Sequence, residues 1–281
     1  MLTSTQELLE KAQKYSYAVG AFNLYNLEGA KAVVNAAEAD NSPAIIQILP
    51  HILKYGGPPL IALFLEAADS ASVPMSVHLD HCEEPAIIKA ALEAGIQSVL
   101  ADGSKFSYQE NLNFTREMTT LSHAKGATVE AEIGRISGTE DGMTVAEKEA
   151  KMTDPNQAKE FVAASKVDFL AVTIGKVLGQ YYSEPRLDFA RLAQVRQRLA
   201  IPLVLHGASG LPALMNQRSI ELGVCKFNVN TEVRQKYLQF WREYGKTDSK
   251  RDLLDCQKAA TSAMQEIIAQ KIRLFGSAGK A

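Results

Sequence analysis

The sequence predicts an α/β fold, a single (β/α)8 (TIM) barrel domain that spans residues 1–281. Short apolar segments alternate with amphipathic helical stretches almost from end to end, which is typical of a parallel sheet whose strands are joined by helices. The apolar segments are nearly continuous, as expected for strands buried on both faces. No Gly-x-Gly-x-x-Gly turn follows the first segment, which argues against an open dinucleotide-binding sheet.

Eight strands are predicted from these apolar segments. In chain order they are Tyr17–Asn23, Ala44–Ile48, Met75–Leu79, Ser98–Ala101, Thr128–Glu132, Phe169–Ile174, Pro202–His206 and Cys225–Val229. Helices of amphipathic pattern are predicted between them, for example at Leu27–Ala39, Pro58–Ala71 and Gln157–Ala164. The sequence Thr153-Asp154-Pro155 marks a helix start, because proline has a fixed φ and needs no donor at the first helical position.

Two further segments carry expectations of their own. Residues Arg135–Thr153 are rich in Gly, Ser, Thr and charge, and their length suits an active-site loop over the mouth of the barrel. The stretch Arg251–Leu274 is helical in pattern and exceeds what barrel closure needs. We expect it to support an oligomer interface in a homodimer or homotetramer.

Composition excludes several classes of partner. The 30 basic and 32 acidic residues give a net charge of −2, so there is no basic surface for nucleic acid and no polybasic patch for a membrane. No apolar run reaches the roughly 20 residues of a membrane helix, and the first residues lack a signal-peptide pattern. A cytoplasmic protein is therefore expected. Cys82, Cys225 and Cys256 form no CxxC pair, which argues against a disulfide framework.

Polar residues at the ends of the predicted strands form a candidate site, because the carboxyl ends of barrel strands meet at one mouth. They are Asn23, Asp80, His81, Asp102, Glu130, Glu132, His206, Asn228 and Asn230, a set suited to a metal or to acid–base chemistry. Of the five histidines, His81 and His206 follow apolar strands, and their pattern leaves a ligand role and a structural role equally open. We expect His78 to be structural, and His51 and His123 to be solvated.

Several longer segments match one family. The chain resembles the class II (zinc-dependent) ketose-bisphosphate aldolases of the tagatose- or fructose-bisphosphate type. The resemblance covers nearly the whole chain, and its segments occur in matching order: Ala21–Glu28, Val77–His81, Ala101–Ser104, Val129–Gly134, Gly138–Gly142, Leu205–Gly210, Lys226–Glu232 and Phe275–Ala281.

The resemblance implies a role for each matching residue. Asp80 would move a proton at the C4 hydroxyl, and Glu140 would exchange the carbon-bound proton of the triose. His81 and His206 would bind zinc or another divalent cation, with Glu132 as a nearby or alternative ligand, and the metal would act as a Lewis acid. The substrate, a small sugar phosphate, would be bound by Asn23, Gly179, Gly207, Ser209, Asn228, Asn230 and Thr231.

Two residues depart from the family pattern. Leu178 stands where the family has its second metal histidine, and Leu49 stands where relatives have a small polar residue. We therefore expect a weakly bound metal, with Cys82 as a soft alternative ligand. The leading function is cleavage of a phosphorylated ketose to dihydroxyacetone phosphate and an aldehyde. The alternatives are a non-catalytic or weakly active paralogue that binds sugar phosphates, and an enzyme in which Lys176 forms a Schiff base.

Overall fold

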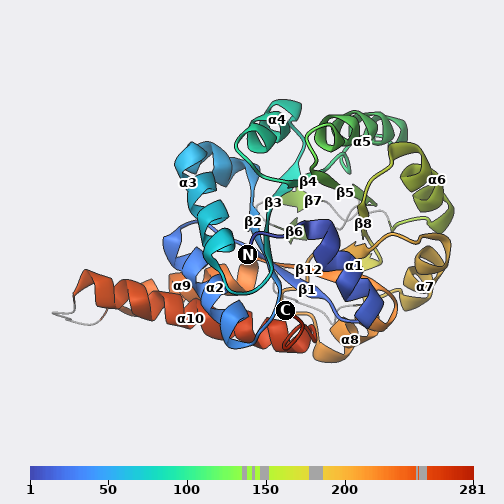
Figure 1. The fold of residues 1–281 in the computed structure, drawn as a ribbon. Helices are drawn as coiled ribbons and strands as arrows, with labels where there is room; N and C mark the ends of the chain where they lie inside the picture. The colour runs from blue at the N-terminus through green and yellow to red at the C-terminus, as the bar shows by residue number, and fades with distance from the viewer. Residues whose placement is uncertain (135–137, 141–142, 146–151, 177–185, 245, 247–251) are drawn as a thin grey trace.

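Eight parallel strands close into a barrel with helices around it in the computed structural model (Figure 1). Around the barrel their order is β1-β12-β11-β8-β5-β4-β3-β2. The predicted (β/α)8 fold is confirmed. The structure describes residues 1–281 apart from 135–137, 141–142, 146–151, 177–185, 245 and 247–251, and apart from the side chains of 138–140, 143–145, 176 and 186.

The barrel strands lie within a few residues of their predicted bounds. They are β1 (Val19–Asn23), β2 (Ala44–Ile48), β3 (Met75–Cys82), β4 (Ser98–Ala101), β5 (Thr128–Ile133), β8 (Phe169–Val172), β11 (Leu203–Leu205) and β12 (Val224–Val229). Every residue in them is buried, as the continuous apolar segments predicted. The main difference is at β3, which ends at Cys82 and not at Leu79.

Helices occupy connections between the strands, and further helices precede the first barrel strand and follow the last. They are α1 (Thr5–Tyr15), α2 (Leu27–Ala39), α3 (Pro50–Ser70), α4 (Pro85–Glu93), α5 (Tyr108–His123), α6 (Pro155–Ser165), α7 (Phe189–Arg198), α8 (Ala213–Glu221), α9 (Thr231–Tyr244) and α10 (Leu253–Leu274). The predicted helix at Pro58 is the second half of α3, since Gly57 has a φ of 57° and divides α3 by a kink. Asp154 caps α6 as its sequence indicated, and its side chain accepts from the backbone N–H of Asn156 and Gln157.

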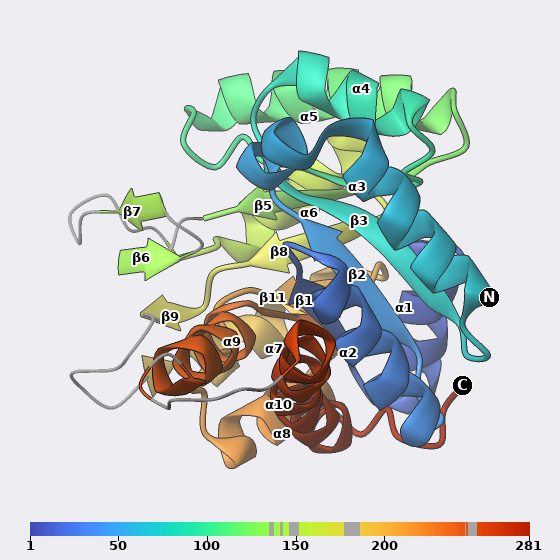
Figure 2. The same cartoon turned by 90° about the vertical axis from the view of Figure 1, so that its left-hand side faces the viewer.

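The interior of the barrel has an apolar end and a polar end. At the amino ends of the strands, α1 covers the barrel (Figures 1 and 2), although it was not among the predicted helices. Its inner face joins an apolar cluster of Leu8, Leu9, Ala12, Tyr17, Val19, Ala21, Ile45, Phe169, Ala171, Val204 and Cys225. This cluster closes one end to water, so polar chemistry is confined to the opposite end.

The helices α9 and α10 lie side by side and extend beyond the barrel wall (Figures 1 and 2). Leu238, Leu253 and Leu254 are exposed on this extension. The predicted oligomer interface lies here, and assembly stays a prediction. Within the part of the chain that the structure describes, no helix combines the length and apolarity that a membrane crossing needs.

Part of the predicted active-site loop forms a small hairpin. The strands β6 (Gly138–Glu140) and β7 (Met143–Val145) pair antiparallel, and they lie at the end of the barrel opposite α1 (Figure 2). A second antiparallel pair, β9 (Gly175–Lys176) with β10 (Arg186–Leu187), follows β8. The rest of the loop and the segment with Leu178 lie outside the described residues.

The burial of two leucines predicts that replacing each by alanine will change the free energy of unfolding by very different amounts. Leu192 of α7 is fully buried, whereas Leu214 of α8 is 79% exposed. Leu192→Ala should lower the free energy of unfolding by about 2–5 kcal/mol, because it leaves a cavity in packed core. The matched control Leu214→Ala should change it by less than about 0.5 kcal/mol. Urea denaturation measures both, and equal losses would contradict this packing.

Candidate active site at the mouth of the barrel

The end of β3 places two neighbouring residues in the barrel interior. Between the pairs Leu79↔Val99 and Cys82↔Ala101, β3 has one residue more than β4, which is a β-bulge. His81 has a φ of 42°, in the left-handed region that non-glycine residues rarely adopt. Side chains of successive strand residues normally alternate, but the bulge lets Asp80 and His81 both contact interior groups.

Asp80 is held by three amide groups. Its Oδ2 accepts from Asn23 Nδ2 at 2.8 Å. Its Oδ1 accepts from Asn228 Nδ2 at 3.1 Å and from Gln47 Nε2 at 3.2 Å. All four residues are buried, so these hydrogen bonds fix the carboxylate without help from bulk water. An ionised carboxylate so held is a competent proton acceptor.

His81 and His206 each bind a carboxylate through one ring nitrogen. His81 Nδ1 lies 2.7 Å from Asp102 Oδ2, and His206 Nε2 lies 2.8 Å from Glu130 Oε1. The two rings meet edge to face with their centroids 4.6 Å apart. The other two nitrogens, His81 Nε2 and His206 Nδ1, make no hydrogen bond within the described part of the chain. A carboxylate behind each imidazole is the usual support of metal-binding histidines.

Glu132 supplies an oxygen beside the two histidines. Its Oε2 lies 3.2 Å from His206 Nδ1 and 3.9 Å from His81 Nδ1. Two ligand atoms that share a tetrahedral metal at about 2.0–2.2 Å are separated by roughly 3.3 Å. The donor atoms of Asp80, His81 and His206 also lie within 4.8 Å of one another. The residues therefore fit a divalent cation with two imidazole ligands and carboxylate oxygens.

Burial and charge oppose each other in this site. Burial raises the pKa of Asp80, but the positive charges of His81 and Lys226 outweigh it and lower that pKa below its ordinary value. Burial lowers the pKa of His206, but its contacts with Glu130 and Glu132 raise it to about 10. A metal that binds these imidazoles must therefore displace protons.

The supporting pairs behave in the same way. Burial raises the pKa of Asp102 and of Glu130, but their hydrogen-bonded and charged neighbours hold both well below the ordinary range. His81, despite its burial, has its pKa raised by Asp80 and Asp102. His78 differs, since burial and Lys226 lower its pKa to about 3. Its Nδ1 contacts Ser98 Oγ at 2.7 Å, in agreement with the structural role expected for it.

Two residues of this network were missed by sequence reasoning. Gln47 contacts Asp80, and Lys226 Nζ donates to Glu130 Oε2 at 2.8 Å. Both are fully buried in strands. The sequence could have indicated both residues, because a charged or amide side chain inside an otherwise apolar strand needs a buried hydrogen-bond partner.

The residues predicted to bind the sugar phosphate divide into two groups. Gly207 and Ser209 lie in the turn after β11, and Thr231 begins α9; Gly210 N–H donates to Glu232 Oε1 at 2.7 Å, which joins the turn to the helix. Asn230 Oδ1 accepts from the hydroxyl of Tyr25 at 2.8 Å. The side chains of Asn23 and Asn228 instead contact Asp80.

Four predicted positions fall outside what the structure describes, among them the side chain of Lys176 on β9. Gly179 and Leu178 lie outside the described residues, and Glu140 ends β6 with its side chain outside the description. Their roles stay predictions. Cys82 is described, and its Sγ donates to the backbone oxygen of Glu84 at 3.5 Å, while burial raises the pKa of its thiol to about 11. It belongs to neither group of described residues placed to hold a metal.

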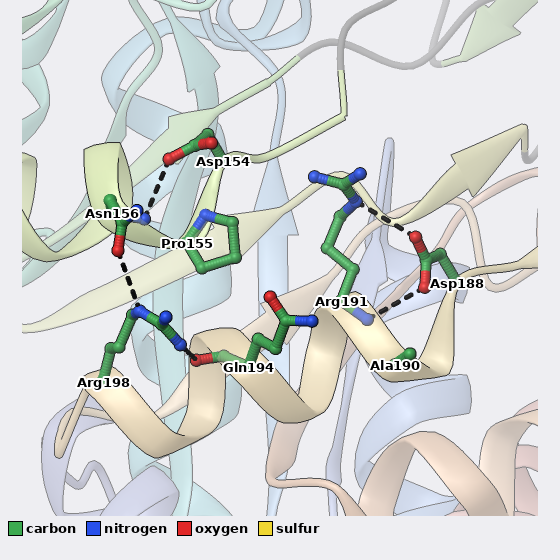
Figure 3. A pocket seen from close by; sticks show the side chains of 8 residues that line it. All are labelled: Asp154, Pro155, Asn156, Asp188, Ala190, Arg191, Gln194 and Arg198. Atoms are coloured by element: carbon green, nitrogen blue, oxygen red, sulfur yellow. Dashed lines mark hydrogen bonds and ion pairs between the residues drawn. The ribbon is translucent and has the colours of Figure 1, made fainter.

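Among the cavities lined by described residues, two lie away from this charged network. One of about 270 Å³ lies between α6 and α7 (Figure 3). There Arg191 pairs with Asp188 at 3.2 Å, and Arg198 Nε donates to Asn156 Oδ1 at 3.0 Å. An apolar cavity of about 220 Å³ lies between the turn after β1 and α9, with Asn23 in its lining. Only the second contains a predicted site residue.

The chain is similar to known proteins over nearly its whole length. The sequence pattern of the family described as Fructose-bisphosphate aldolase class-II matches residues 3–280. The D-tagatose-1,6-bisphosphate aldolase subunit GatY of Klebsiella oxytoca is 40% identical over 281 residues, which is 99% of each chain. The YdjI aldolase of Escherichia coli K12 has a similar crystal structure, with a TM-score of 0.87 and 33% identity over 100% of both chains. A candidate fructose-1,6-biphosphate aldolase from Coccidioides immitis has a TM-score of 0.91 and 36% identity, covering 98% of this chain and 97% of its own.

The raised pKa of His206 predicts how stability depends on pH when a chelator removes metal. A group whose pKa is higher in the folded than in the unfolded state makes its full contribution to the free energy of unfolding at pH values below its unfolded pKa. That contribution is lost as pH rises from 6.5 toward about 10. The free energy of unfolding should therefore fall across this range, and His206→Gln should flatten the decline. The control, His51→Gln at an exposed position, should keep the parent slope. A parent whose stability is flat or rising would contradict the prediction.

Proposed function

The chain belongs to the class II fructose-bisphosphate aldolase family, and from this premise we propose that it cleaves a phosphorylated ketose to dihydroxyacetone phosphate and an aldehyde. The substrate class is a tagatose- or fructose-1,6-bisphosphate. The observation that carries the proposal is the buried group of Asp80, His81 and His206, with Glu132 Oε2 3.2 Å from His206 Nδ1. It combines a fixed carboxylate with imidazole nitrogens that make no hydrogen bond among the described residues.

His81 Nε2, His206 Nδ1 and Glu132 are the groups that would hold zinc or another divalent cation. A bound cation supplies positive charge that stabilises the enediolate of dihydroxyacetone phosphate as the C3–C4 bond breaks. Asp102 and Glu130 keep the two imidazoles oriented through the nitrogens they contact.

Two carboxylates would move the protons. Asp80 accepts the proton of the C4 hydroxyl while the C3–C4 bonding electrons pass to C3 and the aldehyde leaves. Glu140 returns a proton to C3, which completes dihydroxyacetone phosphate. The hydrogen bonds from Asn23 and Asn228 hold Asp80 in one position during this transfer.

The phosphate would bind at the turns after β11 and β12. Gly207, Ser209 and Thr231 supply backbone amides and hydroxyls there, with Asn230 beside them and Gly179 added from the segment after β8. Such neutral donors suit an anion, since successive backbone N–H groups and a helix start favour negative charge.

A second candidate function rests on Leu178 and Leu49. Leu178 cannot coordinate a metal, and Leu49 is buried directly after β2, where it caps α3. Both favour a paralogue that binds sugar phosphates with little or no cleavage. Calorimetry with dihydroxyacetone phosphate, run beside the cleavage assay, separates the two functions. Binding without cleavage under every metal condition would support the paralogue and exclude the aldolase.

Asp80→Asn tests the proton transfer. It removes the base but keeps the shape of the side chain, so kcat for cleavage should fall by roughly 10²–10⁴-fold. The matched control is Asp69→Asn in α3, outside the barrel interior, which should keep parent activity. A coupled assay for triose phosphate release, with and without added zinc, measures both. An active Asp80→Asn enzyme would assign the proton transfer elsewhere.

Leu178→His tests the metal ligand set. With two imidazoles, the protein purified without added metal should contain less than one zinc per chain. A third imidazole should raise zinc affinity by at least the roughly 10- to 100-fold associated with supporting ligands, and cleavage should rise with it. Leu178→Ala, which removes the leucine without adding a ligand, is the control. If Leu178→His gained neither affinity nor activity, the ligand position inferred from the family would be wrong here.

A further inference from the structure

Lys226 is a buried cation inside the barrel that the proposed function leaves without a task. It lies on β12 and is fully buried. Its Nζ donates to Glu130 Oε2 and to Asn228 Oδ1, at 2.8 Å in both cases. A buried charge of this kind is costly unless its partners are well placed, so its contacts deserve a physical explanation.

One contact of Lys226 leads to a candidate metal ligand. Glu130 is also fully buried, and its other oxygen accepts from His206 Nε2 at 2.8 Å. Lys226 Nζ takes Glu130 Oε2 and so fixes the plane of this carboxyl group, which leaves Oε1 to face His206 Nε2 as a hydrogen-bond acceptor. His206 must then donate through Nε2, which leaves Nδ1 for the side where Glu132 Oε2 lies.

The other contact leads to the candidate proton acceptor. Lysine has donors and no acceptor, so Asn228 must present its oxygen to Lys226. The amide group of Asn228 is thereby turned with Nδ2 toward Asp80 Oδ1, at 3.1 Å. Gln47 Nε2 also donates to Asn228 Oδ1, but at the longer distance of 3.3 Å. Without the lysine, only this longer contact would oppose a rotation of the amide that presents its oxygen to the carboxylate.

From these two lines of contact we infer that Lys226 is a positioning residue that orients both His206, through Glu130, and Asp80, through Asn228. It joins the two halves of the site by one unbroken series of buried hydrogen bonds. This inference rests on the proposed function for the roles of His206 and Asp80, but the geometry it predicts can be tested without any cleavage assay.

The test compares Lys226→Met with the parent by crystal structures and by zinc calorimetry on the full chain. In Lys226→Met we expect the Asn228 amide to turn and His206 to lose its single orientation. Zinc affinity should fall by roughly 10- to 100-fold, as it does when the support of a ligand is removed. Thr5→Val is the control for a lost buried hydrogen bond, because Thr5 Oγ1 donates to Ser76 Oγ at 3.0 Å at the other end of the barrel. It should lower the melting temperature and leave zinc affinity unchanged.

A double variant keeps the test decisive if Lys226→Met does not fold. Glu130→Gln with Lys226→Met removes both buried charges, and the amide oxygen of the glutamine can still accept from His206. We expect it to bind zinc nearly as tightly as the parent, a comparison that does not need a folded single variant, while Asn228 stays misoriented, because only the first line of contacts is restored.

Three outcomes would overturn the inference. They are parent zinc affinity in Lys226→Met, unchanged orientations of His206 and Asn228 in its crystal structure, and a double variant that binds zinc much more weakly than the parent. A parent chain that bound no zinc would instead overturn the metal site of the proposed function. The two crystal structures would then still decide whether Lys226 orients His206 and Asn228.

Discussion

Barrel closure is the constraint on which the site depends. The pairing of β1 with β12, from Val19↔Lys226 to Phe22↔Val229, joins the first barrel strand to the last. It brings Asn23 into the same interior as Asn228, so that Asp80 on β3 accepts from both. Asn23 and Asn228 are both far from Asp80 in the chain, so neither hydrogen bond could form in an isolated segment.

Closure also produces an interior in which charges must be balanced without water. Glu130 and Lys226 are fully buried, and each has its charge met by a partner at 2.8 Å. The apolar cluster under α1 closes the amino end of the barrel, which concentrates these polar groups near the mouth. A low-dielectric interior strengthens their interactions and makes an unpaired member costly. The same groups that hold the strands together therefore also set the orientations of the candidate ligands.

Local backbone strain has a place in this arrangement. His81 has a positive φ at the bulge of β3, a conformation that costs a non-glycine residue free energy. It persists because Asp102 holds the ring at 2.7 Å and the neighbouring strands fix the backbone. The result is that a carboxylate and an imidazole adjacent in sequence both contact the interior, which a regular strand does not permit.

The sequence by itself determined the barrel, because near-continuous apolar segments such as Ala44–Ile48 have few alternatives to a strand covered on both faces. It also predicted Asp80, His81, Glu132 and His206 as site residues, through their places at strand ends and through family segments, and the structure brings these four side chains close together. Only the tertiary structure decided which ring nitrogen of His81 and of His206 contacts a carboxylate. It also decided that Asn23 and Asn228 contact Asp80, and that Lys226 and Gln47 belong to the same network. These facts depend on the register between strands and on a single-residue bulge. The sequence shows which polar residues are present, but which of them form hydrogen bonds with one another is decided by the closed barrel.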